Sequence, residues 1–219
     1  HGKEIFKFQS SDYYIVSAGL SPDGKTLAAL AFQQNGVSLD SHVQFYDVSS
    51  GKLHADVSLP NALGIELCYT DNNTAAVLCD DGLYLVSRRG TAEQVLTSAS
   101  GDLIAFAKQD NALALATRSY AGNARADLYT VRGGTLSGPY ALLEEPTALS
   151  VSSAGTAVLS ASGATVYDST FAPRWRNSDA VGARRLLLTG DGTLFALYTK
   201  NARIFTARST NSEDLSHAT

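Results

Sequence analysis

The chain has 219 residues, and 17 lysine and arginine residues stand against 21 aspartate and glutamate residues, so the formal net charge is −4. A chain so poor in positive charge lacks the basic field that holds phosphates, and nucleic acid is therefore not expected as a partner. No apolar run reaches the length of a membrane span, and no signal peptide or lipidation motif is visible.

The sequence contains no methionine. We therefore expect a mature product or an excised segment of a longer protein, in which His1-Gly2 is either native or the remnant of a tag. An export signal or membrane anchor encoded upstream would not be seen in this chain.

The first repeat shows how the chain is organised. A turn between its first two strands contains Pro22, which presets φ, and Gly24, which accepts positive φ. A longer polar loop separates the second and third strands. The apolar and polar residues alternate as half-buried strands require, and predict strands at residues 14–18, 26–31, 42–46 and 53–59.

The same order of strands and turns recurs four more times. An aromatic residue marks the third strand of each repeat, roughly every 40 residues, as in propeller blades. These aromatics are Tyr46, Tyr84, Tyr129, Tyr167 and Phe205. Because a residue type repeated once per unit suits packing between neighbouring sheets, we expect all five to be mostly buried and to face the same way.

The sequence therefore predicts an all-β fold, a β-propeller of four-stranded antiparallel blades with five repeats. We expect one domain over residues 1–208 and a polar tail over 209–219. The predicted blades cover residues 13–59, 62–98, 101–143, 146–178 and 181–208.

The fifth repeat lacks an outer strand after Phe205. Residues 2–8 resemble the outer strand that begins at Gly51, so we predict that this N-terminal segment completes the last blade and closes the ring. The alternative is a fragment of a seven- or eight-bladed protein, in which residues 2–8 would belong to a preceding blade.

Cysteine and histidine give no sign of a metal or cofactor site, and none is expected. Cys68 and Cys79 flank the turn at residues 71–74, and a three-residue turn would place Cys68 opposite Ala76 and Cys79 on the other side of the sheet. Two buried thiols are the simpler interpretation. No pair with ligand spacing occurs among His1, His42, His54 and His217.

The turn at residues 21–25 and the segment Tyr46-Asp47-Val48-Ser49-Ser50-Gly51-Lys52 resemble blades of WD40-like and YVTN-type bacterial propellers. Trp-Asp and Gly-His dipeptides are lacking, and Trp175 does not recur as in quinone-binding propellers. The chain is also similar to exported propellers of Gram-positive bacteria, many of them anchored in the membrane at the N-terminus. That resemblance implies an extracytoplasmic location and no established activity.

Function is expected on one face, called here the loop-rich face. It is formed by the connections between successive blades and by the loops between second and third strands, whereas the tight-turn face opposite offers little to grip. We predict a non-catalytic scaffold that binds an unknown protein, peptide or glycan there. The candidate binding residues are Tyr13, Gln34, Asp40, Asp81, Tyr120, Arg125, Glu145, Asp179 and Asn201.

A glycoside hydrolase is the alternative function. Five-bladed glycosidases place acids around the axis, and acids precede the first strands here, although the connections are short. They are Asp12, Asp102, Glu144, Glu145 and Asp179. We also expect Arg184 or Arg185 to form an ion pair with one of the acids, and Arg174 and Arg176 to be solvated peripheral charges.

Overall fold

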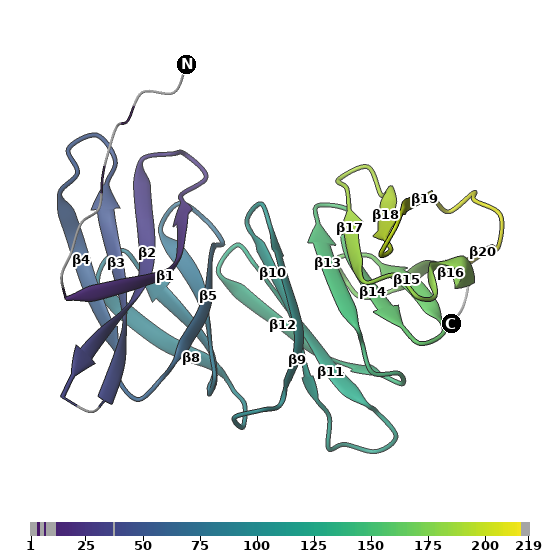
Figure 1. The fold of residues 1–219 in the computed structure, drawn as a ribbon, viewed down its shortest axis with the longest axis horizontal. Coiled ribbons are helices and arrows are strands. Elements are labelled where there is room, and N and C mark those ends of the chain that lie inside the picture. Colours follow the sequence, from purple (N-terminus) through teal and green to yellow (C-terminus); the bar gives the residue numbers. More distant parts are fainter. Residues whose placement is uncertain (1–3, 5–6, 8–11, 37, 216–219) are drawn as a thin grey trace. The chain divides into compact units, whose positions relative to one another are not determined.

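The computed structural model of the protein describes residues 4, 7, 12–36 and 38–215. The described residues form five antiparallel β-sheets and one short 3₁₀ turn, η1 (Ser178–Ala180) (Figure 1). The predicted all-β fold with five repeats is confirmed. None of the helical structure in the described part is long and apolar enough to cross a membrane.

The chain divides into two compact units, and the first comprises residues up to Gly101 together with the hairpin tip Val131–Leu136. This N-terminal unit contains two four-stranded sheets, each with strands in sequence order. The first sheet consists of β1 (Tyr13–Leu20), β2 (Thr26–Asn35), β3 (Ser38–Asp47) and β4 (Leu53–Leu59). The second consists of β5 (Gly64–Tyr69), β6 (Thr74–Cys79), β7 (Gly82–Ser87) and β8 (Thr91–Thr97).

The C-terminal unit comprises residues 102–130 and 137–219. Its first sheet consists of β9 (Leu103–Gln109), β10 (Ala112–Arg118), β11 (Ala126–Arg132) and β12 (Thr135–Leu142). The next contains β13 (Ala148–Ser152), β14 (Gly155–Ser160), β15 (Gly163–Tyr167), β16 (Pro173–Asn177) and β20 (Ser212–Asp214). The last contains β17 (Arg185–Leu188), β18 (Leu194–Leu197) and β19 (Ala202–Phe205). Among the described residues, no outer strand of this sheet follows Phe205, as the sequence predicted.

The polar tail expected from residue 209 contains a strand. β20 pairs antiparallel with β16, and the Asn177 side-chain amide donates to the Thr210 carbonyl at 3.0 Å and to Ser212 Oγ at 2.8 Å. An unpaired sheet edge offers backbone groups that a polar segment can satisfy, which the composition of the tail did not reveal. Ring closure by residues 2–8 lies outside the described residues and stays a prediction.

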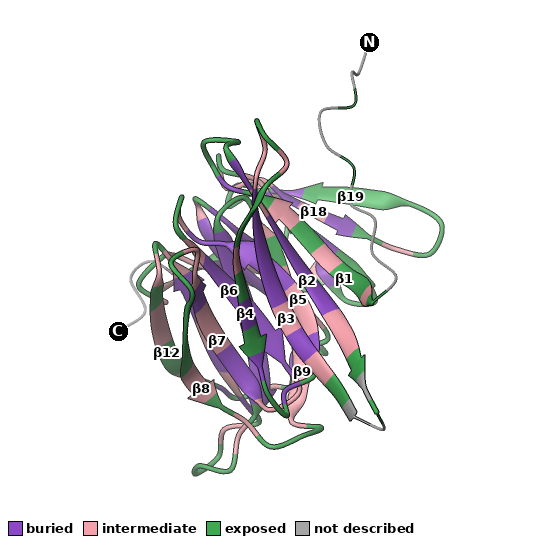
Figure 2. Cartoon of the chain, turned by 90° about the vertical axis from the view of Figure 1, so that its left-hand side faces the viewer, coloured by how far each residue is buried: buried purple, intermediate pink, exposed green. Residues whose placement is uncertain are grey.

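Within each unit, the cores lie between successive sheets and bury the second strands most completely (Figure 2). The sheet containing β14 illustrates this, because Val158 packs with the preceding sheet whereas Ala157 and Leu159 pack with the following one. Side chains alternate between the faces of a strand, so burial of both faces requires apolar or small residues throughout. In the N-terminal unit, Leu30 and Val77 belong to one such core between the two sheets.

The aromatic residues of the third strands behave as predicted. Tyr46 and Phe205 are buried, and the other three are half-buried. Three of these aromatics pack in the core that their sheet shares with the preceding sheet of the same unit. They are Tyr84, Tyr167 and Phe205. Tyr46 and Tyr129 belong to the first sheet of each unit, and each lies on the face opposite the core shared with the following sheet. All five aromatics therefore occupy equivalent faces of their sheets, as predicted.

The two cysteines also match the predicted register. Cys68 pairs with Ala76, and both cysteines are free buried thiols. Only Cys79 belongs to the core between the two N-terminal sheets, so the thiols lie on opposite faces of their sheet. Burial raises the pKa of the Cys79 thiol to about 12.

Substitution of Gly82 tests whether β7 and β8 pair as closely as described. At Gly82, with φ of +141°, a Cβ atom would lie 1.9 Å from the Leu96 carbonyl oxygen, whereas at Gly90, with φ of +92°, a Cβ atom would meet open space. We expect Gly82→Ala to lower the free energy of unfolding by about 3 kcal/mol or more, because the backbone must shift. Gly90→Ala carries only the conformational cost of about 1–2 kcal/mol. Urea unfolding of both variants measures this, and equal losses would contradict the described pairing.

Candidate functional site

In the N-terminal unit, Tyr13 belongs to a polar network on the first sheet. Its hydroxyl donates to Asp56 Oδ2 at 3.1 Å, and its ring meets that of His42 edge-on at 5.3 Å. The other Asp56 oxygen lies 2.8 Å from His42 Nδ1, and Gln44 Nε2 donates to Oδ2 at 2.9 Å. Tyr46 extends the network by donating to Gln44 Oε1, and burial raises the pKa of Tyr46 to about 12.

The other N-terminal candidates lie at turns between second and third strands. Gln34 is exposed and donates to the Gly36 carbonyl at 3.3 Å, and Asp40 is half-buried at the start of β3. Asp81 Oδ2 accepts from the Tyr84 hydroxyl at 2.7 Å. Its Oδ1 is buried without a hydrogen-bond partner within the described ranges.

In the C-terminal unit, Tyr120 protrudes from the loop between β10 and β11, with 79% of its surface exposed. Its hydroxyl donates to Asp102 Oδ1 at 2.8 Å, and this hydrogen bond raises the pKa of Tyr120. Arg118 Nε lies 4.0 Å from the same oxygen. Arg125 is exposed at the other end of the loop, which is anchored where the Arg125 amide donates to the Leu142 carbonyl at 2.7 Å.

The remaining three candidates follow the same pattern. Asp179 in η1 accepts from Asn211 Nδ2 at 3.1 Å with each of its carboxylate oxygens. Asn201 is exposed in the turn between β18 and β19, and Glu145 is exposed beside Glu144. Within the described residues, no hydrogen bond joins two of the nine candidates, so the structure gives them separate partners and their common role stays a prediction.

Glu144, which is not among the nine binding candidates but is one of the acids of the alternative function, forms a site of its own. It lines a pocket of about 270 Å³ between β12 and the β14–β15 hairpin. The Ser162 hydroxyl and amide both donate to the Glu144 carboxylate, and Arg176 Nη2 lies 3.6 Å from Oε1. Tyr167 and Ser160 also line this pocket.

The electrostatics of the carboxyl groups is uniform. Where the pKa of a described Asp or Glu is clearly shifted, it is lowered, because a neighbouring Ser or Thr hydroxyl donates to the carboxylate. These residues are Glu144, Asp23, Asp47, Asp168 and Asp191. Such groups stay ionised at neutral pH, which suits turn-forming acceptors rather than proton donors. The described part of the chain contains no group of three potential metal ligands.

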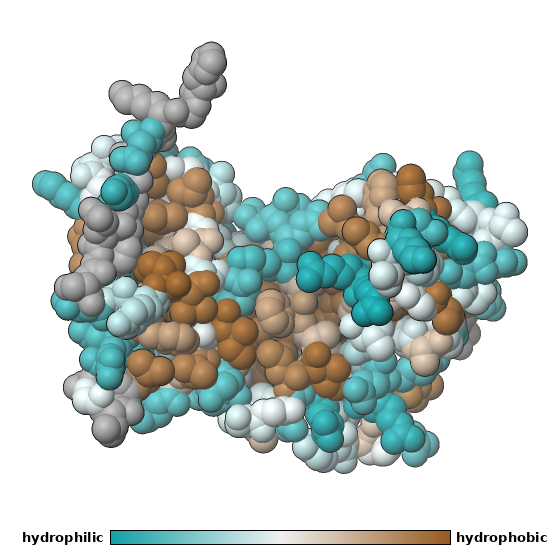
Figure 3. Space-filling view, in the orientation of Figure 1, coloured by the Kyte–Doolittle hydropathy of each residue, from teal (hydrophilic) through white to brown (hydrophobic). Residues whose placement is uncertain are grey.

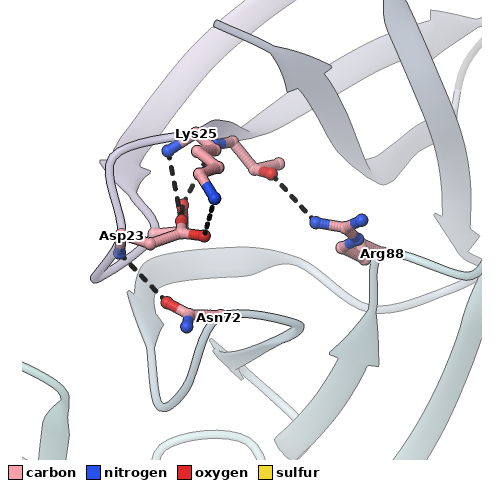
Figure 4. Close-up of polar contacts among 6 residues, drawn as sticks. Asp23, Lys25, Asn72 and Arg88 are labelled. Atoms are coloured by element: carbon pink, nitrogen blue, oxygen red, sulfur yellow. Dashed lines mark hydrogen bonds and ion pairs between the residues drawn. The ribbon is translucent and has the colours of Figure 1, made fainter.

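The tight-turn face is closed by contacts between neighbouring turns, as Figure 4 shows for the N-terminal unit. The Asp23 amide donates to Asn72 Oδ1 at 3.0 Å, and Arg88 Nη1 donates to Thr26 Oγ1 at 3.4 Å. Lys25 Nζ lies 3.8 Å from Asp23 Oδ2. The polar groups of these turns therefore serve the joints between sheets.

A second pocket, the inner-strand pocket, has a volume of about 460 Å³ and lies at the first strands of the three C-terminal sheets. It opens where β9, β13 and β17 begin, the end that carries the loop-rich face. Figure 3 shows apolar surface over β9, where Phe106 is 38% exposed. The pocket is lined by Leu103–Phe106, Thr147–Leu149, Arg185 and Leu186.

Two expectations about arginine are wrong. Arg174 lies 3.1 Å from Asp168 and Arg176 pairs with Glu144, so neither is a merely solvated charge. Conversely, Arg184 donates to Thr199 Oγ1, and no ion pair in the described part involves Arg184 or Arg185. The β15–β16 turn brings Arg174 and Asp168 together, and the connection between β12 and β13 brings Glu144 to Arg176. In contrast, β17 has no acid opposite it, because Arg185 pairs with Leu197.

Sequence reasoning missed three features that the fold assembles: the His42–Asp56 pair, the Glu144 pocket and the inner-strand pocket. The first had a signal, since residues 42 and 56 lie on paired strands and face the same side. The pockets had none, because each combines residues of two or three sheets.

The comparisons bear on the fold and the family. Residues 1–139 match a family described as "Family of unknown function (DUF5711)". The chain belongs to DUF5711. Among solved structures, the DUF5711 chain is similar to the Dos1 propeller, with TM-score 0.56 and 16% identity over 90% of this chain and 55% of that one. It is also similar to the computationally designed protein Ika4, with TM-score 0.50 and 15% identity over 77% and 99%.

These structural likenesses show the propeller fold alone, because the identities are low. The chain spans about half the length of the Dos1 propeller chain. A comparison with curated proteins gives no match.

The Glu144 site gives a pH-dependent prediction. The Ser162 hydrogen bond holds the pKa of Glu144 below its ordinary value of 4.5, so the folded state favours the ionised carboxylate. We expect Glu144→Gln to lower the free energy of unfolding at pH 7 by about 1 kcal/mol, allowing for its solvent exposure. The difference from wild type should persist above pH 4.5 and shrink as the pH falls through the lowered pKa. Glu145→Gln is the control, and an equal effect there would contradict the site.

Proposed function

We propose that this protein is a non-catalytic binding scaffold whose loop-rich face recognises a protein, peptide or glycan. The propeller fold supports a scaffold or binding role in general. One observation carries the proposal further: the loop-rich face combines exposed recognition side chains, Tyr120 and Arg125, with acids that are already engaged by neighbours. Tyrosine and arginine are the residue types that most often anchor interfaces.

The engaged acids favour binding over glycoside hydrolysis. A glycosidase needs one carboxylic acid with a raised pKa beside a second, ionised carboxylate. Here Asp102 accepts from Tyr120, Asp179 accepts from Asn211, and Glu144 accepts from Ser162 with a lowered pKa. These three acids therefore already have hydrogen-bonding partners within the protein.

The loop between β10 and β11 is suited to adaptable recognition. Its ends are fixed by backbone hydrogen bonds, with Ser119 donating to the Arg125 carbonyl and Arg125 donating to Leu142. Between these anchors lie small residues and Tyr120, held over Asp102. A rigid scaffold with a tethered aromatic lowers the entropy cost of binding.

We further propose an extracytoplasmic location, which rests on the resemblance to exported Gram-positive propellers. An epitope-tagged full-length protein in its native host should be degraded when intact cells are treated with an impermeant protease. Resistance until lysis, matching a cytosolic control, would overturn the proposal.

The binding face can be tested by arrays of peptides and glycans probed with the whole chain. We expect ligands whose affinity falls at least about tenfold in the Tyr120→Ala/Arg125→Ala variant, since interface anchors commonly contribute this much. The matched control is Asp23→Ala/Asp191→Ala on the tight-turn face, which should bind as the wild type does. Loss in the control with retention in the loop variant would show that the face is misassigned.

A further inference from the structure

The inner-strand pocket exposes strand edges rather than strand faces. Its lining includes the consecutive residues 103–106 of β9 and 147–149 at the start of β13. Because alternate side chains point to opposite faces, a consecutive run can line one pocket only if the edge of the strand faces it. β9, β13 and β17 are each the terminal strand of their sheet, so these edges are not paired with another strand.

Farther along β13 and β17, serine side chains bridge the two sheets by hydrogen bonds. The Ser150 hydroxyl oxygen accepts from the Leu188 amide at 2.8 Å, and Ser152 Oγ donates to the Thr189 carbonyl at 3.1 Å. At the pocket, none of the described hydrogen bonds joins one first strand to the next. The pocket therefore lies where no hydrogen bond among the described residues bridges the three strand edges.

The side chains of the residues that line the pocket are apolar apart from Thr147 and one cation. Ile104, Phe106 and Leu149 contribute the apolar surface, and Arg185 is its charged lining residue. Arg185 is exposed, and no ion pair among the described residues involves it, as is also true of Arg184 beside it. A guanidinium beside apolar surface is complementary to a carboxylate that carries apolar groups.

We propose that the inner-strand pocket binds the C-terminal end of an extended peptide. The terminal carboxylate pairs with Arg185, an apolar side chain packs against Ile104, Phe106 and Leu149, and the peptide backbone lies along the strand edges. The volume of about 460 Å³ fits a short segment rather than a folded domain. The unpaired edges favour a peptide over an alkyl chain, which has no backbone groups to use them. This inference rests on the proposed binding function and names its ligand class.

The test uses fluorescence anisotropy with the whole chain and two labelled hexapeptides. Both are rich in Val and Leu; one ends in a free carboxylate and the other in an amide. We expect the acid to bind at least about tenfold tighter than the amide, since a charge-assisted hydrogen bond is lost in the latter. Arg185→Gln should reduce the acid to the level of the amide, and Phe106→Ser should weaken both.

Arg208→Gln is the matched control, because Arg208 is an exposed arginine of the same unit outside the pocket. It should leave both affinities unchanged. Circular dichroism and thermal midpoints confirm folding, and Arg185→Lys, which keeps the charge, should retain part of the preference for the acid.

The proposal would be overturned by no binding of either peptide, by equal binding of acid and amide, or by equal losses in Arg185→Gln and Arg208→Gln. Displacement by decanoate with higher affinity than the peptide would assign the pocket to an alkyl carboxylate and also overturn it. A ligand that depends on Tyr120 and Arg125 but not on Arg185 would leave the proposed function intact while refuting this inference.

Discussion

The structure depends on the burial of the second strands, which in β6, β10 and β14 includes both faces. In the sheet containing β14, Val158 packs with the preceding sheet, and Ala157 and Leu159 pack with the following one. Such a strand has no solvent face, so a polar side chain there would lose its water without gaining a partner. Within each unit, apolar side chains of the second strands therefore hold neighbouring sheets together. What remains for recognition is the first strands, with one open edge each, and the loops at the strand ends.

This constraint explains why the architecture could be predicted from the sequence. Small apolar segments between turn signals identified the second strands, and the periodic aromatics from Tyr46 to Phe205 fixed the repeat. The register around Cys68 followed from the length of one turn, because an alternating side-chain pattern leaves a single choice once the turn is set. The turn residues, the apolar segments and the repeat are therefore sufficient to predict the sheets and their order.

The binding features could not be predicted in the same way. Arg185 was expected to meet an acid because two adjacent arginines open a strand, but its partner in the sheet is Leu197, and the surrounding strands contribute Phe106 and Leu149. Glu144 was placed among axial acids, yet its environment is a hairpin turn with Ser162. β20 forms because the outer edge of β16 is available for pairing. Each outcome depends on which residues of different sheets become neighbours, and no periodic pattern encodes that.

The distribution of satisfied and unsatisfied charges separates structural from recognition groups. Carboxylates such as Asp47 and Asp168 accept hydrogen bonds from hydroxyl groups two residues away, and their lowered pKa values show that the folded state favours their charge. Arg174 and Arg176 likewise have carboxylate partners. Arg185 is an exposed arginine beside apolar strand edges, and no ion pair within the described residues involves it. A charge retained without an internal partner is available to an external one, and Arg185 occupies that position at the end of the strands where the loops also converge.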